Sequence, residues 1–309
     1  MTTVDSDLAV RLVDALNGLY GTHPGRRAAH AKGMYCAATF TPTADAAALS
    51  RAPHFRGAPV PALVRFSNGS GNPAAPDGTN DGRGMAVKFD LGDGASTDIV
   101  ALTLPVFFAR DPESFLEFTR VRTPDPATGK PDMGAVMAYL GAHPEASGAV
   151  QAGMSMRPPA SFAQLTYHGI HSFRFVDASG GARHVRYRWT PEAGEASLDP
   201  EEAKARDADF LRAELSDRLA GGPVVFTLSA IVASPGDDVD DPTVAWPDSR
   251  QTVELGRLEI TGLAEDPERD GGVIVFDPTN VVDGIECSDD QILHARRVAY
   301  SESVNRRIR

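Results

Sequence analysis

The sequence contains little lysine and cysteine, and it has no long hydrophobic run. Only four of its 30 basic residues are lysines, a bias that codon usage explains, although a guanidinium also binds carboxylates better than an ammonium does. The two cysteines, Cys36 and Cys287, form no CxxC pair and cannot build a disulfide framework, so we expect two buried thiols. No stretch of about 18 apolar residues is present that could span a membrane.

Excess basic charge and an export signal are also missing. The formal net charge of −12 argues against non-specific nucleic-acid binding, which needs basic side chains to replace phosphate counterions, and against a polybasic membrane patch. The first twenty residues carry acids where a signal peptide carries bases, and Leu8, Leu12, Leu16 and Leu19 fall on one helical face. We therefore predict an N-terminal docking helix over residues 1–20 and a cytoplasmic protein with neither nucleic-acid nor membrane partners.

What the sequence does contain is a series of strand-like runs around a helical insert. Strands are predicted at residues 33–41, 62–67, 85–89, 98–104, 170–176, 184–190, 224–233 and 255–263. Helices are predicted at residues 111–120, at 133–154 with an interruption near Pro144, from Asp199 to Gly221 as the longest, and from about Ser288 onward. This order favours an α+β fold over a βαβ series, and no linker divides residues 1–309, so we expect one domain.

Three patterns resemble ligand sites but lack the spacing that such sites need. The loop at residues 69–84 is rich in glycine but has neither a GxGxxG spacing nor a Gly-Lys-Ser/Thr ending. His168 and His171 are three apart without a cysteine or acid to complete a zinc set. The acids at residues 237–241 lack the spacing of a calcium loop. None of the three patterns predicts a site by itself.

The residues that could carry chemistry are also unremarkable one at a time. His30 alone has the character of a structural histidine. Arg65 and Ser67 lie on the same face of a strand, because side chains alternate with period two. Arg296 and Tyr300 are four apart on a helix and are therefore neighbours. Each of these pairs is expected on an ordinary polar surface.

Taken together, these residues fall within blocks that resemble the haem catalases in order and approximate spacing. The blocks are HAKG, VRFS, RGMAVKF, PVFFARDPESF, YHGIHSF and FDPTNVVDGIECSDDQILHARRVAY, and the resemblance runs from about Thr22 to Arg307. It implies an antiparallel β-barrel of about eight strands with surrounding helices, holding one haem b.

On the proximal side of such a haem, the resemblance places three residues of this sequence. Tyr300 matches the iron ligand, and phenolate is a known ligand of haem iron. Arg296, one helical turn away, matches the residue that donates to the phenolate and favours the anion. His171 matches a further proximal position. An anionic ligand supports high-valent iron, which peroxide cleavage requires.

On the distal side, the resemblance places the acid/base group and the haem-holding side chains. His30 matches the residue that takes a proton from one peroxide oxygen and returns it to the other, and Ser67 matches its hydroxyl partner. Phe115 matches an aromatic ring stacked on the porphyrin. Arg27, Arg65 and Arg307 match the arginines that bind the propionates. Because Arg27 and His30 would face opposite sides of a regular strand, we expect a bulge, a twist or a strand start between them.

The sequence departs from typical catalases at one distal position and in its length. Leu102 replaces the distal asparagine, which leaves Thr103 as the nearby polar substitute. The sequence ends nine residues after Tyr300, whereas large catalases continue with helical and flavodoxin-like regions. The match is therefore with shortened, catalase-related peroxidases that lack this region, and we expect a monomer or a small homo-oligomer.

The expected activity is reduction of organic hydroperoxides, and of hydrogen peroxide with weak catalase activity, using a small-molecule electron donor. Three alternatives stay open: a true catalase, a hydroperoxide isomerase and a haem carrier. Ala29 counts against the isomerase, because allene oxide synthases of this family carry threonine just before the distal histidine. The combination of His30, Ser67 and Tyr300 counts against a carrier, which needs no distal acid/base group.

Overall fold

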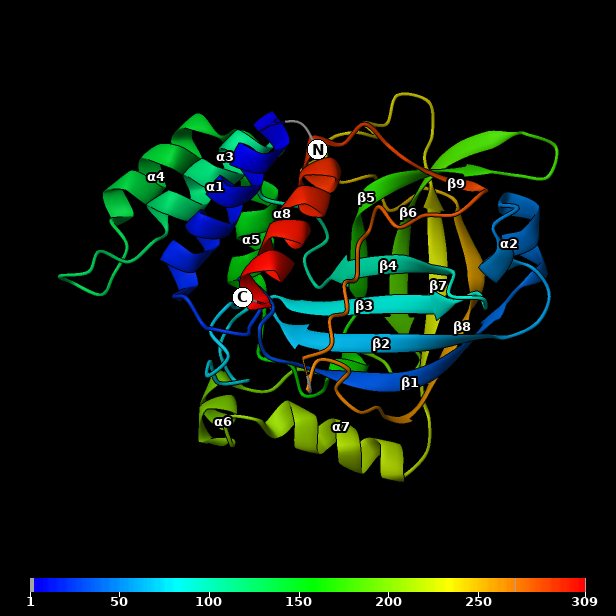
Figure 1. Ribbon diagram of the computed structural model, residues 1–309, viewed down its shortest axis with the longest axis horizontal. Coiled ribbons are helices and arrows are strands. Elements are labelled where there is room, and N and C mark those ends of the chain that lie inside the picture. Colours follow the sequence, from blue (N-terminus) through cyan, green and yellow to red (C-terminus); the bar gives the residue numbers. More distant parts are fainter. Residues whose placement is uncertain (1–2, 270, 309) are drawn as a thin grey trace.

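Eight antiparallel strands close into a barrel at the centre of the computed structural model, which describes residues 3–269 and 271–308 (Figure 1). The strands are β1 Gly33–Pro42, β2 Val60–Asn68, β3 Arg83–Asp90, β4 Ser96–Leu102, β5 Tyr167–Val176, β6 Ala182–Pro191, β7 Val224–Val232 and β8 Thr252–Leu263. Each strand pairs with its neighbours in sequence, β1 pairs with β8, and the pair Leu102–His168 joins β4 to β5. The predicted barrel of about eight strands is confirmed.

A ninth strand, β9 Ile285–Cys287, extends the sheet beside β5. It pairs with residues 173–175, whereas β4 pairs with β5 at its other end, through His168. The short β9 was not predicted from the sequence, because three residues carry too little pattern to indicate a strand.

Alternation along the strands separates the barrel interior from its outer face. Val64 and Phe66 of β2 are fully buried in the main hydrophobic core, where Phe66 packs against Phe162 and Phe226. The residues between them point the other way, as the period of two predicts. A strand with an apolar interior face and a polar outer face thus supplies both the core and a surface for a site.

The helices fall into two groups around the barrel. On one side lie α1 Thr3–Tyr20, α3 Pro112–Val121, α4 Met133–Ala142, α5 Ser147–Ser155 and α8 Gln291–Arg307 (Figure 1). Elsewhere lie α2 Ala44–Leu49, α6 Pro200–Ala205, α7 Phe210–Ala220 and short 3₁₀ turns at Pro53–Phe55, Pro144–Ala146 and Phe162–Gln164. None of the described helices combines the length and the apolar character needed to cross a bilayer.

The N-terminal helix packs against two other helices. Leu12 and Ala15 of α1 are buried in one cluster with Leu116 of α3 and Ala295 of α8. Helix α1 therefore lies against both α3 and α8, and this three-helix cover faces the barrel.

The predicted long helix from Asp199 to Gly221 is wrong, because residues 206–209 break it into α6 and α7. Tertiary hydrogen bonds hold the break. The Ala208 carbonyl accepts from Lys32 Nζ at 2.7 Å and from the backbone N–H of Asp77 at 2.9 Å, and the Asp77 carboxylate caps the N–H of Leu211. These partners lie more than 130 residues away in sequence, so no local pattern could indicate the break.

The two cysteines differ in exposure. Cys36 on β1 is fully buried, and burial raises the pKa of its thiol to about 12, so it stays protonated and unreactive at neutral pH. Cys287 is only partly buried, which corrects the expectation of two buried thiols. Burial, followed by the nearby Asp277, still raises the pKa of Cys287 to about 11.

Candidate active site

A cavity of about 630 Å³ lies between the outer face of β2–β4 and the helical cover. Eight predicted site residues line it: Arg27, His30, Arg65, Ser67, Phe115, Arg296, Tyr300 and Arg307. Thr103 and His171, which were also predicted, do not line the cavity. The barrel wall and the cover thus bring together residues that are as much as 280 positions apart in sequence.

His30 lies in the loop just before β1, which resolves the conflict between its side-chain direction and that of Arg27. Its backbone adopts φ of 55°, a left-handed conformation that is strained for a residue with a side chain. Two contacts hold it there: the His30 N–H donates to the Gly69 carbonyl at 3.0 Å, and Arg65 Nη2 donates to the His30 carbonyl at 2.8 Å. The expected strand start is confirmed, since β1 begins at Gly33.

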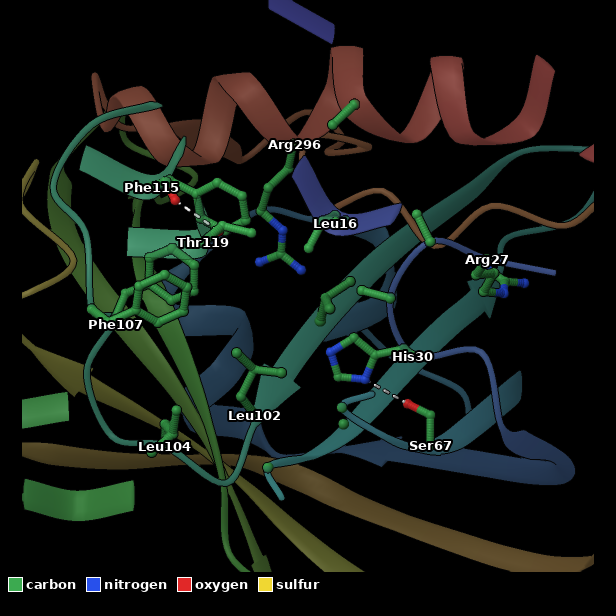
Figure 2. A pocket seen from close by; sticks show the side chains of 18 of the residues that line it. Leu16, Arg27, His30, Ser67, Leu102, Leu104, Phe107, Phe115, Thr119 and Arg296 are labelled. Carbon is green, nitrogen blue, oxygen red and sulfur yellow. Dashed lines mark hydrogen bonds between the residues drawn. The ribbon is translucent and has the colours of Figure 1, made fainter. Parts of the chain in front are cut away.

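The imidazole of His30 is oriented by Ser67. Nδ1 lies 3.0 Å from the Ser67 hydroxyl, and Figure 2 shows the ring reaching into the cavity from the barrel side, opposite Arg296. Burial, followed by the positive charges of arginines including Arg65 and Arg296, lowers the pKa of His30 to about 3. His30 is therefore neutral at physiological pH and can accept a proton.

Gly84 of β3 supports this pair, although the sequence did not single it out. A Cβ at this position would lie 2.8 Å from the Ser67 hydroxyl and 3.0 Å from Nδ1 of His30. Such contacts are closer than side chains tolerate, so a glycine is required for the histidine and the serine to meet. Leu102 pairs with Gly84 across β3 and β4 and lines the cavity beside them.

On the opposite side, α8 presents Tyr300 and Arg296 to the cavity. Arg296 donates from Nε at 3.0 Å and from Nη2 at 2.6 Å to the Tyr300 hydroxyl oxygen. A cationic fork with two donors on one oxygen stabilises negative charge there. The predicted contact between these helical neighbours is confirmed.

Behind Arg296, a buried chain of polar groups fixes its orientation. Arg296 Nη1 donates to Nε2 of His171 at 2.9 Å, so the other ring nitrogen, Nδ1, carries the proton and donates to Oδ2 of Asp290 at 2.6 Å. Burial lowers the pKa of His171, although the Asp290 carboxylate opposes this shift. His171 thus acts through Arg296 rather than from the cavity wall.

Asp290 is a site residue that sequence reasoning missed. Its Oδ1 accepts from the N–H groups of Ile292 and Leu293 and caps α8, while its Oδ2 holds His171. The capping role was visible in the sequence as an aspartate before a helix. The second role was not, because the histidine lies 119 residues away.

Three arginines converge at one end of the cavity. Arg27 and Arg307 both donate to the carboxylate of Glu268, and Tyr35 donates to the same carboxylate. Burial, followed by Arg27, lowers the pKa of Arg65 to about 10, which reflects crowded positive charge. The region favours anions, and Glu268 was not found from the sequence.

The buried polar atoms of this region test whether a haem fits. The Nε atoms of Arg27, Arg65 and Arg307 are buried without a hydrogen-bond partner in the part of the chain that the structure describes. Buried N–H donors are rarely left unpaired, and two carboxylates such as haem propionates would satisfy them. The arginines therefore fit the group that the sequence predicts.

The residues around Tyr300 also fit a haem. Among residues 3–269 and 271–308, no cluster of three or more His, Cys, Asp or Glu side chains is placed to hold a metal ion. Tyr300, with its oxygen held by Arg296, offers one oxygen donor, which suits an iron that brings its remaining ligands in a porphyrin. Phe115 also lines the cavity, with its ring 6.1 Å from Phe107 and nearly parallel to it.

The remaining wall of the cavity is largely apolar. Leu16, Leu102, Leu104 and Phe107 surround the space in front of His30 (Figure 2). Thr103 points away from this space: its hydroxyl oxygen accepts from the backbone N–H of Arg83 at 3.0 Å and the hydroxyl lies 3.7 Å from Met156 Sδ. Leu102, rather than the predicted polar side chain of Thr103, therefore lines the cavity near His30.

Comparisons with known proteins agree with this geometry. The catalase family model matches residues 12–309. A catalase-related peroxidase of Mycolicibacterium paratuberculosis is 45% identical over 96% of this chain and 93% of its own length, and one of Synechococcus elongatus is 36% identical over 97% and 88%. The crystal structure of a fungal catalase superposes with a TM-score of 0.83 at 25% identity.

That superposition covers 96% of this chain but 62% of the fungal chain, and a solved bacterial catalase gives the same TM-score with 60% of its length covered. The chain thus spans about three fifths of the length of these solved catalases, and the shared part is the barrel with its helical cover. With the family model matching nearly the whole sequence, this chain belongs to the catalase family.

Proposed function

We propose that this member of the catalase family, a peroxide-acting oxidoreductase, is a haem b peroxidase that reduces organic hydroperoxides with a small-molecule electron donor. The observation that carries the proposal is the arrangement across one cavity: a neutral, oriented His30 faces Tyr300 and Arg296, and Leu102 lies beside the histidine. We further propose weak activity toward hydrogen peroxide, a cytoplasmic location and a monomer or small homo-oligomer.

When bound, the haem supplies the iron that takes up two oxidising equivalents from the peroxide. Tyr300 would hold its iron, and Arg27, Arg65 and Arg307 would bind its propionates. Arg296 keeps negative charge on the tyrosine oxygen through two N–H donors. His171 and Asp290 hold Arg296 in place, so the charge on the proximal side is fixed before substrate arrives.

His30 moves the proton. With the Nδ1 proton donated to the Ser67 hydroxyl, Nε2 has a free lone pair that can take the proton from the hydroperoxide oxygen. The same nitrogen then returns the proton to the other oxygen as the O–O bond breaks, so an alcohol leaves rather than an alkoxide. The low pKa of His30 makes its protonated form short-lived, which favours this return.

Leu102 favours an organic hydroperoxide over hydrogen peroxide. Oxidising a second hydrogen peroxide to dioxygen needs polar groups that orient it, and this position has none to offer. An apolar wall instead accommodates the carbon chain of a larger substrate, because burying such a chain is favourable. This feature argues against a true catalase, the second candidate.

An optical titration tests the proposal. The purified, haem-loaded protein should show a ferric high-spin spectrum that changes on addition of one equivalent of tert-butyl hydroperoxide and returns faster when an electron donor is added. Vigorous dioxygen release from hydrogen peroxide would favour the true catalase. Product formation without any donor would indicate an isomerase, and a haem spectrum that ignores peroxide would indicate a carrier.

A further inference from the structure

Arg122, at the C-terminal end of α3, is a cavity-lining cation to which the proposed chemistry assigns no role. Five arginines line the cavity. Arg27 and Arg307 bind Glu268, Arg65 lies with them at the proposed propionate site, and Arg296 holds Tyr300. Arg122 is the fifth, and it is half-buried.

The contacts of Arg122 leave its charge without a carboxylate. Its guanidinium lies 5.0 Å from the ring centre of Phe118, and it is close enough to Tyr20 to lower the pKa of that phenol, which burial raises overall. In the described residues no ion pair joins Arg122 to an acid. Within the cover, Arg11 pairs with Glu113 and Arg306 with Asp14. Arg120 and Arg297 also have no ion pair in the described residues, but unlike Arg122 they do not line the cavity.

One face of α3 carries Arg122 together with three other residues that line the cavity. Phe115, Phe118, Thr119 and Arg122 are spaced at i, i+3, i+4 and i+7, and all four line the cavity. The Thr119 hydroxyl donates to the Phe115 carbonyl at 2.7 Å, so its proton is used within the helix (Figure 2). The face is therefore apolar over roughly 10 Å of helix, at 1.5 Å per residue, and ends in a cation.

Helix α1 and the loop before β3 complete the surroundings of Arg122. Leu16 and Leu19 of α1 line the cavity with further apolar surface. Asp81 is the acid among the lining residues, and its carboxylate accepts the Ser70 N–H at 2.7 Å and lies 4.0 Å from Arg83. Burial raises the pKa of Asp81, although Arg83 and backbone N–H groups, including that of Ser70, oppose the shift.

We propose that Arg122 binds the carboxylate of the substrate, and that the preferred substrates are fatty-acid hydroperoxides. The carboxylate pairs with the Arg122 guanidinium, the hydrocarbon chain lies along the α3 face and Leu16, and the hydroperoxide reaches His30. This inference rests on the proposed peroxidase function and names its substrate class.

Kinetics on the haem-loaded protein test the inference with a matched pair of substrates. Linoleic acid hydroperoxide and its methyl ester differ in charge but not in the reacting group, and both are used below the concentration at which they form micelles. We expect kcat/KM for the acid to exceed that for the ester by about 10- to 100-fold, the range of a hydrogen bond to a charged group. The difference should lie in KM, because the contact is far from the reacting bond.

Variants separate the carboxylate contact from general damage. Arg122→Gln should remove the preference for the acid and leave kcat/KM for tert-butyl hydroperoxide unchanged, whereas Arg122→Lys should keep part of the preference. Arg120→Gln, on an exposed position of the same helix, is the control and should match the wild type. Calorimetric binding of linoleic acid itself, which undergoes no turnover, should weaken in Arg122→Gln alone.

The outcomes distinguish this inference from the function on which it rests. Equal kcat/KM for acid and ester in the wild type, with both turned over, would overturn the role of Arg122 and leave the peroxidase intact. An unchanged preference in Arg122→Gln would do the same. If no organic hydroperoxide reacts, tert-butyl hydroperoxide included, the proposed function fails, and fatty-acid binding alone then decides whether Arg122 is a carboxylate site.

Discussion

Gly84 shows how closely the distal side chains are packed. No atom larger than hydrogen fits at this position without displacing the His30 ring or the Ser67 hydroxyl. Because the hydrogen bond between those two groups orients the His30 imidazole, the absence of a side chain at Gly84 is itself part of the candidate site. A neighbouring glycine, Gly82, also lines the cavity but has no such neighbours: its nearest contact would be Thr103 at 4.0 Å.

Replacing Gly84 with alanine should therefore slow the reaction with peroxide while leaving haem in place. We expect the rate of the spectral change with tert-butyl hydroperoxide to fall by about 10- to 100-fold, since small misplacement of a catalytic group costs that much. Gly82→Ala is the control and should retain the wild-type rate. Equal rates in both variants would mean that His30 does not depend on its contact with Ser67.

A second substitution tests the role of Leu102 in choosing the substrate. Leu102→Asn places an amide beside Gly84 and His30, where it can orient a second hydrogen peroxide, so dioxygen release should rise. Leu102→Ala removes the same leucine from the cavity wall without adding an amide and should have no such effect. An oxygen electrode measures both. No increase in Leu102→Asn would mean that access to the haem, rather than the leucine, limits catalase activity.

Sequence reasoning singled out cavity-lining residues whose partners are close along the chain or that match a motif. The pairing of Arg296 with Tyr300 follows from helical spacing, and the shared face of Arg65 and Ser67 follows from strand alternation. It missed Asp290 and Glu268, since Asp290 binds His171 from 119 positions away and Glu268 binds Arg27 from 241 positions away. It also could not show that Thr103 faces away from the cavity, because that direction depends on where β4 ends.

Helices and strands were likewise predicted where nearby residues determine them and missed where distant residues do. Strands with clear alternation were predicted to within a few residues, and the helix at α3 was located by its aspartate cap and first-turn proline, with Asp111 accepting from the Ser114 N–H at 2.8 Å. The break between α6 and α7 was missed, because Lys32 and Asp77 impose it from another part of the fold. The local sequence therefore predicts a helix whose cap is local, such as α3, but not a break that contacts with distant residues impose.

Helix α1 contributes to the site as a wall rather than through catalytic groups. Leu12 is 4% exposed and packs between α3 and α8, and it also lines the cavity. Leu12→Ala should lower the free energy of unfolding by about 2–5 kcal/mol, the usual range for such a truncation in a core, and should speed haem loss. Val10→Ala, at a 37% exposed position of the same helix, should change stability by less than about 0.5 kcal/mol.

Urea unfolding and the rate of haem transfer to an excess of apomyoglobin measure the two effects. If Leu12→Ala were no less stable than Val10→Ala, the packing of α1 on α3 and α8 would not contribute to stability as its burial indicates.

The whole protein carries buried histidines that make its stability depend on pH. His54 is fully buried between Phe55 and Phe89, and neither of its ring nitrogens has a partner among the described residues. Burial lowers the pKa of His54 to about 3 from an ordinary value of 6.5. Between these two values the unfolded chain binds a proton that the folded protein does not, so stability falls as the pH falls from 6.5 toward 3.

His54→Leu should remove this contribution. Above pH 7 the histidine is neutral in both states, so the difference in unfolding free energy between variant and wild type should be constant there. Below pH 6 the variant should gain on the wild type by about 1.4 kcal/mol per pH unit, the value of one proton. Urea titrations at pH 7.5, 6 and 5 measure the difference, and a pH-independent difference would show that His54 is protonated in the folded protein.

The order of the two halves of the site along the chain has a consequence for biosynthesis. His30 precedes the first barrel strand, and Tyr300 and Arg307 follow the last one. A ribosome therefore releases His30 and every barrel strand before it releases Tyr300. Because the outer face of β2–β4 is one wall of the cavity and α8 is the last wall to be synthesised, the barrel can close around its own core before the pocket is complete. We expect cofactor capture to follow translation rather than to guide the folding of the barrel.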